Sequence, residues 1–391
     1  MNLRYVICSE IIDVRDGTHD SPKYIIDGGY PLITSKNINN NKIDFSNVNY
    51  ISEEDYIKIN QRSEVSNGDI IMPMIGTIGN PVIIDTDKKF AIKNVALFKL
   101  ANNETILSKY FYYILKTQDI KRQLESNKRG GTQNFVSLKN IRDLKIPLID
   151  ILEQKKIVEI LDKAQQLIDK RKKQIESLDE LVKSKFIEMF GDPVSNPMNW
   201  DKKRLADECN IITGNTPSRK VEAYYGDYIE WIKSDNITGA GVYLSTAREY
   251  LSKQGLKVGR SIEKDSILMT CIAGSIKCIG NVAIADRKVA FNQQINGIEP
   301  LKNNVYFMLQ QFNLSQKYIQ STINMSLKGI LSKGQLSELE FIFPPIEKQN
   351  EFAEFFKQVD KLKFEMEKSL KELEDNFNSL MQKAFKGELF N

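Results

Sequence analysis

Hydrophobic residues recur at alternating steps of four and three residues in two long segments of the chain. The first stripe contains Ile157, Leu161, Ala164, Ile168, Ile175, Leu178, Val182 and Met189, with Arg171 and Lys185 interrupting it. The second contains Phe352, Phe355, Val359, Leu362, Met366, Leu370, Leu373, Phe377, Leu380 and Ala384, with one step where the spacing slips. Such stripes are typical of a coiled-coil seam, so the pattern predicts two long helices.

The limits of these helices follow from glycine and proline. The segment from Glu153 to Phe190 contains neither residue, and Gly191 and Pro193 supply the expected stop, as Gly387 does for the second helix. A helix over the first segment would be about 57 Å long at ~1.5 Å per residue. Its seam cannot be buried on a single domain, because ordinary helices have three or four turns. We therefore expect the two helices to pack against each other.

The segments before the two helices repeat the same landmarks at an offset of about 195 to 200 residues. Residues 30–38 and 229–237 each contain an apolar run that leads into Ser-x-Asn-Ile. Further pairs of strand and glycine-turn patterns follow, at 68–80 and 265–281. A proline-containing strand then precedes Glu153-Gln154 in the first copy and Glu347-Lys348-Gln349 in the second. The chain is thus predicted to contain one unit twice.

The predicted fold class is α/β (α+β): two globular copies joined by two long helices, with an internal pseudo-two-fold repeat. The expected boundaries are domain 1 at 1–150, helix 1 at 151–191, a linker at 192–200, domain 2 at 201–346, helix 2 at 347–387 and a tail at 388–391. Between the landmarks the copies diverge, for example at 43–66 and 243–263. A shared scaffold with different inserted segments suggests one task performed on two targets.

Composition narrows the class of protein. The 391 residues are 41% hydrophobic and 27% charged, and the net charge of +4 comes from 55 basic and 51 acidic residues. This near balance permits nucleic-acid binding without demonstrating it. Neither a membrane span nor a signal peptide is predicted, so we expect a cytoplasmic protein. The four cysteines are scattered, which supports neither a disulfide scaffold nor a zinc site.

Several motifs together resemble the specificity subunit of type I restriction-modification enzymes. In the first copy they are Gly131-Thr132-Gln133-Asn134-Phe135-Val136-Ser137, Ile146-Pro147-Leu148, Glu153-Gln154 and Met189-Phe190-Gly191-Asp192-Pro193. In the second half, Thr213-Gly214-Asn215-Thr216-Pro217-Ser218 resembles the start of that family's target recognition domains. Each motif is weak alone, but the series occurs in the same order in both halves and covers essentially the whole chain.

The resemblance implies two target recognition domains, each reading one half of a bipartite DNA site, joined by two antiparallel helices that set the spacing. It implies double-stranded DNA, two modification (methyltransferase) subunits and restriction (endonuclease and translocase) subunits as partners. S-adenosylmethionine, ATP and Mg²⁺ are expected on those subunits and no cofactor on this chain. The second copy departs from the pattern with Met325-Ser326-Leu327-Lys328-Gly329 in place of the glycine turn and with a different helix ending.

Catalytic motifs are absent from the sequence, which agrees with a non-catalytic subunit. The segment Phe343-Pro344-Pro345-Ile346 lacks the polar first residue of an adenine methyltransferase loop, and no phosphate-binding Gly-x4-Gly-Lys-Ser/Thr loop occurs. His19 is the only histidine and lies in a turn-like segment. It is a candidate for the base of a catalytic triad or dyad, for a DNA contact, or for a loop side chain without a catalytic role.

Residues that read DNA need bidentate donors and acceptors for base edges, with others to hold phosphates. Those in predicted loops of the first domain are Thr34, Ser35, Lys36, Asn37, Lys128, Arg129, Thr132, Gln133 and Asn134. Those of the second domain are Arg219, Lys220, Lys233, Ser234, Asp235, Asn236 and Lys328. The alternative for the Ser-x-Asn-Ile segments is a turn in which the asparagine bonds its own backbone.

Two other functions remain open at the level of sequence. A recognition module that works with another class of restriction or methylation enzyme would share this domain plan. A coiled-coil scaffold protein without DNA specificity is the reading that involves no DNA.

Overall fold

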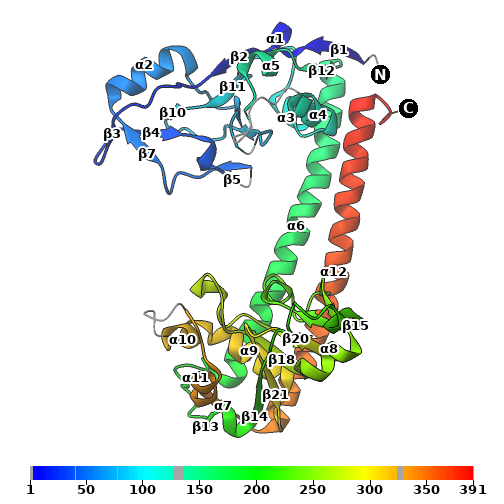
Figure 1. Ribbon diagram of the computed structural model, residues 1–391. Coiled ribbons are helices and arrows are strands. Elements are labelled where there is room, and N and C mark those ends of the chain that lie inside the picture. Colours follow the sequence, from blue (N-terminus) through cyan, green and yellow to red (C-terminus); the bar gives the residue numbers. More distant parts are fainter. Residues whose placement is uncertain (1–2, 40, 77, 127–134, 324–328, 391) are drawn as a thin grey trace. The chain divides into compact units, whose positions relative to one another are not determined.

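The computed structural model describes residues 3–39, 41–76, 78–126, 135–323 and 329–390 (Figure 1). The chain forms two compact units. Unit 1 comprises Met1–Lys170 and Leu370–Asn391, and unit 2 comprises Arg171–Ser369. The long helices α6 (Ile151–Phe190) and α12 (Ile346–Lys386) each contribute residues to both units.

Unit 1 contains two four-stranded sheets. The first has the order β2 (Asp13–Asp16), β11 (Val95–Lys99), β8 (Ile70–Pro73) and β9 (Val82–Ile83), all antiparallel. The second has the order β10 (Ala91–Ile92), β4 (Tyr30–Ile33), β7 (Asn49–Ile51) and β3 (Tyr24–Ile25), in which only β10 and β4 are parallel. Two short ladders join β1 (Arg4–Ile7) to β12 (Lys145–Leu148) and β5 (Ile38–Asn39) to β6 (Lys42–Ile43).

Short helices complete unit 1. They are α1 (Cys8–Ile11), η1 (Ser35–Asn37), α2 (Glu53–Ser63), α3 (Ser108–Leu115), α4 (Gln118–Ser126) and α5 (Leu138–Arg142). Ser52 caps α2, because its side chain accepts a hydrogen bond from the backbone N–H of Asp55. Five of the eight residues of α3 are buried, and they join the start of α6 and the end of α12 in one hydrophobic core.

Unit 2 also contains two four-stranded sheets, and several of its strands are longer. One sheet has the order β14 (Cys209–Thr213), β21 (Ile295–Pro300), β18 (Ser266–Thr270) and β19 (Val282–Ala285). The other has the order β16 (Tyr250–Leu251), β15 (Tyr225–Ile232), β20 (Val289–Phe291) and β17 (Ser261–Ile262), in which β15 and β20 are parallel. A ladder joins β13 (Lys202–Arg204) to β22 (Glu340–Ile342).

The short helices of unit 2 are α7 (Leu205–Glu208), η2 (Glu222–Tyr224), η3 (Ser234–Asn236), α8 (Lys253–Val258), η4 (Ile276–Cys278), α9 (Val305–Leu314), α10 (Gln316–Ser321) and α11 (Lys333–Glu338). The predicted repeat is confirmed by matching pairings. Leu32 opposes Ala91 in unit 1 as Trp231 opposes Ala290 in unit 2. The turn η1 follows β4 as η3 follows β15.

The long helices run antiparallel, as expected. In unit 1 the first part of α6 shares a core with the last part of α12, whereas in unit 2 the last part of α6 shares a core with the first part of α12 (Figure 1). In unit 2 the ring centroids of Phe186 and Phe352 lie 5.3 Å apart, and Lys363 Nζ lies 2.6 Å from Asp179 Oδ1. The predicted mixed α/β fold with an antiparallel helix pair is confirmed.

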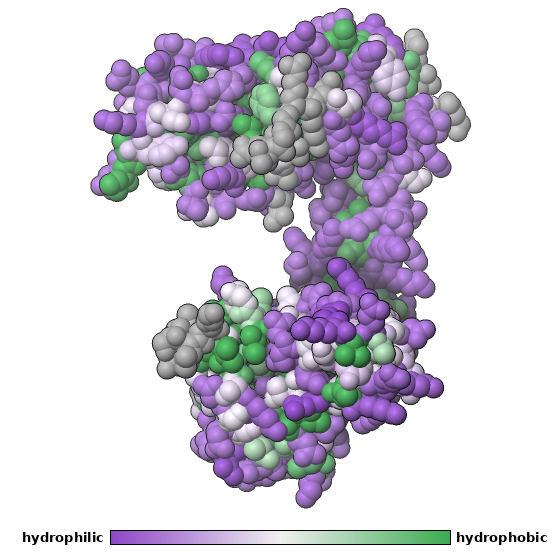
Figure 2. All heavy atoms as spheres, in the orientation of Figure 1, coloured by the Kyte–Doolittle hydropathy of each residue, from purple (hydrophilic) through white to green (hydrophobic). Residues whose placement is uncertain are grey.

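Burial of the predicted seam residues varies along the helices. The buried ones are Ile157, Leu161, Ile168, Leu178, Val182, Phe352, Val359 and Ala384. The half-buried ones are Ala164, Ile175, Met189, Phe355, Met366, Leu370, Leu373, Phe377 and Leu380. The face of the molecule seen in Figure 2 is mainly hydrophilic along the helices, which agrees with apolar residues that lie between them.

Leu362 departs from the predicted seam, since it is 46% exposed. The regular steps from Phe356 through Val359 lead instead to Lys363 and then to Met366. Lys363 is three-quarters buried and pairs with Asp179 of α6. The irregular step in the sequence pattern therefore marks the place where a lysine replaces a hydrophobic residue in the seam.

A buried glutamine at the start of each long helix repeats the same contacts. Gln154 accepts a hydrogen bond from the backbone N–H of Leu107, just before α3, and donates to the carbonyl oxygen of Ile149. Gln349 accepts from the N–H of Asn304, just before α9, and donates to the carbonyl oxygen of Pro344. The Glu-Gln and Glu-Lys-Gln motifs thus join the long helix of each unit to its globular part.

Candidate nucleic-acid interface

The asparagines of the two Ser-x-Asn-Ile turns are structural. Asn37 is 8% exposed; its Oδ1 accepts from the backbone N–H of Thr34, and its Nδ2 donates to the carbonyl oxygen of Asn47. Asn236 is 6% exposed and makes the equivalent bonds with Lys233 N and Thr246 O. Because these amides already bond the backbone, the structure favours the turn role for both residues over the base-reading role considered from the sequence.

The other candidates in these turns keep more of their surface. Lys36 and Asp235 are exposed, whereas Thr34, Ser35, Lys233 and Ser234 are half-buried. Thr34 donates from Oγ1 to Asn37 Oδ1 over 2.9 Å and so belongs to the turn itself. The turns therefore offer Ser35 and Lys36 in unit 1, and Lys233, Ser234 and Asp235 in unit 2, as contact residues.

Two loops at equivalent places are held by the same backbone bonds. In unit 1, Gly17 N donates to Val95 O and Thr18 N to Ile92 O. In unit 2, Gly214 N donates to Ile295 O and Asn215 N to Phe291 O. We call these segments loop 17–22 and loop 214–219.

A glycine begins each loop because the neighbouring strand lies very close. A Cβ atom on Gly17 would lie 2.3 Å from Ile92 O, and one on Gly214 would lie 2.1 Å from Asn292 O. Any other residue would force the two segments apart. The repeated glycine therefore marks equivalent loops.

An arginine on the segment that follows β7 or β16 secures each loop. Arg62 of α2 pairs with the buried carboxylate of Asp16 in unit 1. Arg260, just after α8, donates to the carbonyl oxygen of Thr213 over 2.6 Å in unit 2. Sequence reasoning related loop 214–219 to the start of a recognition domain, whereas it noted loop 17–22 only as a turn-like segment around His19. The signal that could have identified loop 17–22 as its equivalent is the glycine after a strand in Asp16-Gly17-Thr18, which corresponds to Thr213-Gly214-Asn215 in the second copy.

Arg219 of loop 214–219 lies over two aromatic rings. Its Cζ atom is 4.5 Å from the centroid of Tyr225 and 5.1 Å from that of Trp231, and Lys233 Nζ is 5.2 Å from the Trp231 centroid. Both cations pair with Glu249. Such contacts hold flexible cationic side chains in one orientation before a ligand arrives. We refer to Arg219, Tyr225, Trp231, Lys233 and Glu249 as the cation cluster.

Of this cluster, sequence reasoning identified only Arg219 and Lys233 as contact candidates, and Glu249 is the charged residue that it missed. The hydrogen bond from Lys233, and then that from Arg219, holds the pKa of the Glu249 carboxyl below its ordinary value, so the group is charged at neutral pH. The cluster thus carries two cations and one anion, and its net charge is positive. No local motif marks Glu249, because it lies in the divergent segment 243–263 and meets its partners only through the fold.

Of the remaining candidate DNA-contact residues, one is exposed and the others lie outside the described part of the chain. Lys220 is exposed, beside Arg219 in loop 214–219. Lys128, Arg129, Thr132, Gln133, Asn134 and Lys328 lie outside the described residues.

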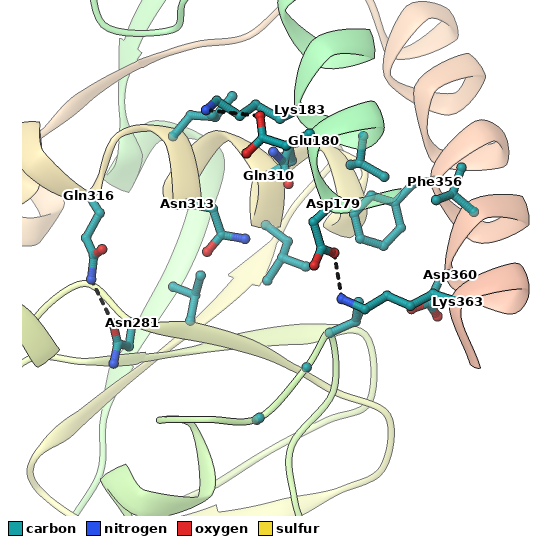
Figure 3. Close-up of a pocket in the computed structure, with 18 of the residues that line it drawn as sticks. Asp179, Glu180, Lys183, Asn281, Gln310, Asn313, Gln316, Phe356, Asp360 and Lys363 are labelled. Carbon is teal, nitrogen blue, oxygen red and sulfur yellow. Dashed lines mark hydrogen bonds and ion pairs between the residues drawn. The ribbon is translucent and has the colours of Figure 1, made fainter. Parts of the chain in front are cut away.

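Cavities lie near some of these elements. In unit 1, a cavity of about 500 Å³ is lined by loop 17–22 and α2 and includes His19 and Arg62. In unit 2, a cavity of about 570 Å³ lies where α6, α9 and α12 meet the segment 237–242 (Figure 3). In its lining Asp179 and Lys363 point toward one another and are 2.6 Å apart, and the described lining contains none of the candidate contact residues.

The described residues contain no group of three or more His, Cys, Asp or Glu side chains that is arranged to hold a metal ion. Within the same residues, no helix is both long and apolar enough to span a membrane.

Comparison with known proteins yields a family match in both halves. Residues 8–179 and 197–375 match the family described as type I restriction modification DNA specificity domain. A candidate type I restriction enzyme specificity subunit of Methanocaldococcus jannaschii, MjaX, is 25% identical over 387 residues, covering 92% of this chain and 87% of that protein. The EcoBI specificity subunit of Escherichia coli is 25% identical over 335 residues, covering 76% and 69%.

Two solved structures resemble the fold over nearly the whole chain. The S subunit of a type I restriction-modification system from M. genitalium has a TM-score of 0.56 at 16% identity and covers 98% of this chain and 96% of its own. A chain from a structural study of complex assembly and conformational transition in a type I restriction-modification system has a TM-score of 0.62 at 18% identity, covering 99% and 98%. At these identities the likeness concerns the fold.

Proposed function

Because the chain belongs to the family of type I restriction-modification DNA specificity domains, we propose that it is the DNA specificity subunit of such a complex. It reads a bipartite, asymmetric DNA site and carries no catalytic step itself. Partner subunits of the restriction-modification system perform the methylation of adenine and the cleavage of unmodified DNA.

The single observation that carries this proposal is the repeat with divergent surfaces. Each half matches the family separately, at 8–179 and 197–375. At equivalent positions the side chains differ: Trp231 and Lys233 stand in unit 2 where Leu32 and Thr34 stand in unit 1. Two copies of one scaffold with different side chains suit the reading of two different half-sites.

We assign residues 1–150 and 201–346 as the two target recognition domains. The linker 192–200 separates the copies, and the helices at 151–191 and 347–387 set the distance between half-sites. The helices support this role because each continues without interruption from one unit into the other. The tail at 388–391 has no assigned part.

The proposed DNA contacts are exposed or half-buried polar residues of the turns and loops. They are Ser35, Lys36, Arg219, Lys220, Lys233, Ser234 and Asp235, with Lys128, Arg129, Thr132, Gln133, Asn134 and Lys328 as further candidates outside the described residues. Thr34, Asn37 and Asn236 shape the turns that present them. Arginine and lysine contact guanine and phosphate, whereas serine and glutamine suit either polar base edges or phosphate.

The proposed complex contains two modification subunits and, in a restricting system, restriction subunits. The count of two modification subunits is what the family resemblance implies, and the presence of two copies of the unit supports it. S-adenosylmethionine, ATP and Mg²⁺ belong to those partners. We place the protein in the cytoplasm.

The test compares the genome-wide pattern of N6-methyladenine in the source organism with and without this chain. We expect a two-part motif with a fixed spacer that disappears on deletion and returns on complementation. An unchanged pattern would contradict the proposal. Copurification with a single large nuclease-methyltransferase chain would instead favour a recognition module of another enzyme class.

A further inference from the structure

His19 connects three segments of unit 1. It lies in loop 17–22, and its Nε2 is 2.9 Å from Asp16 Oδ2 at the end of β2, while its Nδ1 is 2.9 Å from Asn94 Oδ1 just before β11. The other carboxylate oxygen of Asp16 pairs with Arg62 of α2. The imidazole therefore connects the end of β2, where the loop begins, to the residue that precedes β11.

Both ring nitrogens face oxygen acceptors in this arrangement. A neutral imidazole has one N–H donor, whereas the imidazolium has two. With the oxygen of the Asn94 amide facing the ring, the two bonds are satisfied together only when His19 is protonated. These hydrogen bonds, with Asn94 first and Asp16 second, raise the pKa of His19 above its ordinary value of 6.5.

The charges around the ring are mixed. Asp16 is 6% exposed at its side chain and holds both His19 and Arg62, so the three groups carry a net positive charge when His19 is protonated. Lys93 donates to Ser21 of the loop over 2.6 Å. The charged and titratable groups that face His19 or line the cavity beside it come from β2, loop 17–22, α2 and the segment after β10: Asp16, Asp20, Asp55, Lys58, Arg62 and Lys93.

The equivalent position in unit 2 is occupied by a neutral residue. Thr216 is the equivalent of His19, because it follows Asn215 as His19 follows Thr18. Its Oγ1 donates a hydrogen bond to Gln293, which occupies the position of Asn94. Both loops are thus joined to the same neighbouring segment by a side chain. Only the bond in unit 1 can depend on protonation near neutral pH.

We propose that His19 is a positioning residue that holds loop 17–22 in the conformation with which unit 1 reads its half-site. This inference rests on the proposed function and adds a prediction to it. The recognition of one half-site varies with pH, and the recognition of the other does not.

The direction of the pH effect follows from the sign of the shift. Because the pKa is raised in the folded protein, the bridge is complete below pH 6.5 and is lost as the pH rises through the raised value. Above it, one ring nitrogen becomes an acceptor that faces an acceptor oxygen. The loop is then held by one side-chain bond in place of two.

The test uses the full chain in its complex with the modification subunits. DNA is selected from a random pool at about pH 6.0 and about pH 8.5, below and above the range in which a histidine titrates. The variants are His19→Ala, His19→Gln, which keeps an N–H donor for Asp16 but does not titrate, and Thr216→Ala as the matched change in unit 2. Thermal unfolding is recorded for each. Affinity is then measured for duplexes mismatched in one half-site at a time.

The expected result separates the two halves of the motif. His19→Ala lowers the affinity gained from one half-site by about 10-fold at the lower pH, as expected for two lost hydrogen bonds. Thr216→Ala affects the other half by about 5-fold at both pH values, as expected for one lost bond. His19→Gln retains most of the first contribution and abolishes its pH dependence.

The outcomes distinguish this inference from the function on which it rests. If the wild-type complex enriches no two-part motif, the proposed function fails and the inference with it. If the motif is enriched but both halves respond equally to pH, or His19→Gln keeps the pH response, the inference alone is overturned. Should His19→Ala fold poorly, His19→Gln still decides the question.

Discussion

The same strand-and-turn scaffold carries different side chains in the two units. In unit 2, Trp231 on β15 supports Arg219 and Lys233, which Glu249 joins. In unit 1 the equivalent strand position is Leu32, which packs with Ile51 and Ala91 as Trp231 packs with Leu251 and Ala290, and both side chains are buried. No arginine lies over Leu32 among the described contacts, and nearby Tyr30 and Tyr56 stack with ring centroids 3.9 Å apart. Pairing of the backbone is kept while the surface changes. Backbone hydrogen bonds therefore maintain the frame, and side chains are free to define what each unit contacts.

The largest expected effect is on stability and comes from the hydrophobic cores in which the ends of the long helices are buried. Phe186 is fully buried in unit 2 against Phe190, Phe307 and Phe352, whereas Met381 occupies a comparable place near the end of α12 in unit 1. Phe186→Ala should lower the free energy of unfolding by about 3–5 kcal/mol because it leaves a cavity. Chemical denaturation, with Met381→Ala as the matched change in unit 1, measures it. Equal protection of both units by hydrogen exchange in Phe186→Ala would contradict a core confined to unit 2.

The next effect tests whether the two units act on one duplex. One base pair inserted between the half-sites rotates the second by about 34° and shifts it by about 3.4 Å. We expect the affinity for the duplex to fall by about 100-fold or more, because the contacts of one unit are lost. Electrophoretic or fluorescence titrations with spacers of the natural length, one pair shorter and one pair longer, provide the measurement. Affinity that is independent of spacer length would rule out a fixed separation.

Arg219 tests the cation cluster of unit 2. Arg219→Ala should weaken binding about 10-fold through one half-site, since a bidentate arginine contact contributes roughly 1–3 kcal/mol. Arg219→Lys keeps the charge but loses the planar group that lies over Tyr225 and Trp231, so it should recover less than half of the lost binding energy. Titrations against duplexes mismatched in each half decide the matter. Full recovery in Arg219→Lys would mean that charge alone is used.

The smallest effect concerns Glu249. Glu249→Gln removes the anion that pairs with Arg219 and Lys233, so the surface becomes more positive. Binding to unrelated DNA should strengthen and depend more steeply on salt, by about one unit of slope, while the preference for the correct half-site falls a few-fold. A salt series with cognate and scrambled duplexes measures both quantities. Unchanged preference for the cognate duplex would show that the pairing has no part in specificity.

Much of the architecture could be predicted because it depends on periodic or repeated patterns. The stripes that include Leu161 and Val182 predicted long helices, and the helices α6 and α12 are 40 and 41 residues long. The repeated Ser-x-Asn-Ile and proline segments predicted one unit written twice. Local pattern failed at Leu362, where only the partner helix decides that Lys363 faces the seam, through Asp179.

Less of the candidate site could be predicted. Asn37 and Asn236 had the side chains of base readers, but burial against their own turns commits their amides to the backbone. Glu249 and His19 were not recognised as partners of Lys233 and Asn94, respectively. Glu249 lies 16 residues from Lys233 in sequence, and His19 lies 75 residues from Asn94. Such pairs leave no local signature.

The order of residues alone determined the duplication, the two long helices and the family resemblance, because periodicity, glycine and proline act through neighbours in the chain. The tertiary structure decided which polar side chains remain available: it buried Asn37 and Asn236, placed Arg219 over Trp231, and set His19 between Asp16 and Asn94. These outcomes depend on contacts between distant segments. A side chain's hydrogen-bond partners, and so its freedom to meet a ligand, are fixed only when those segments come together.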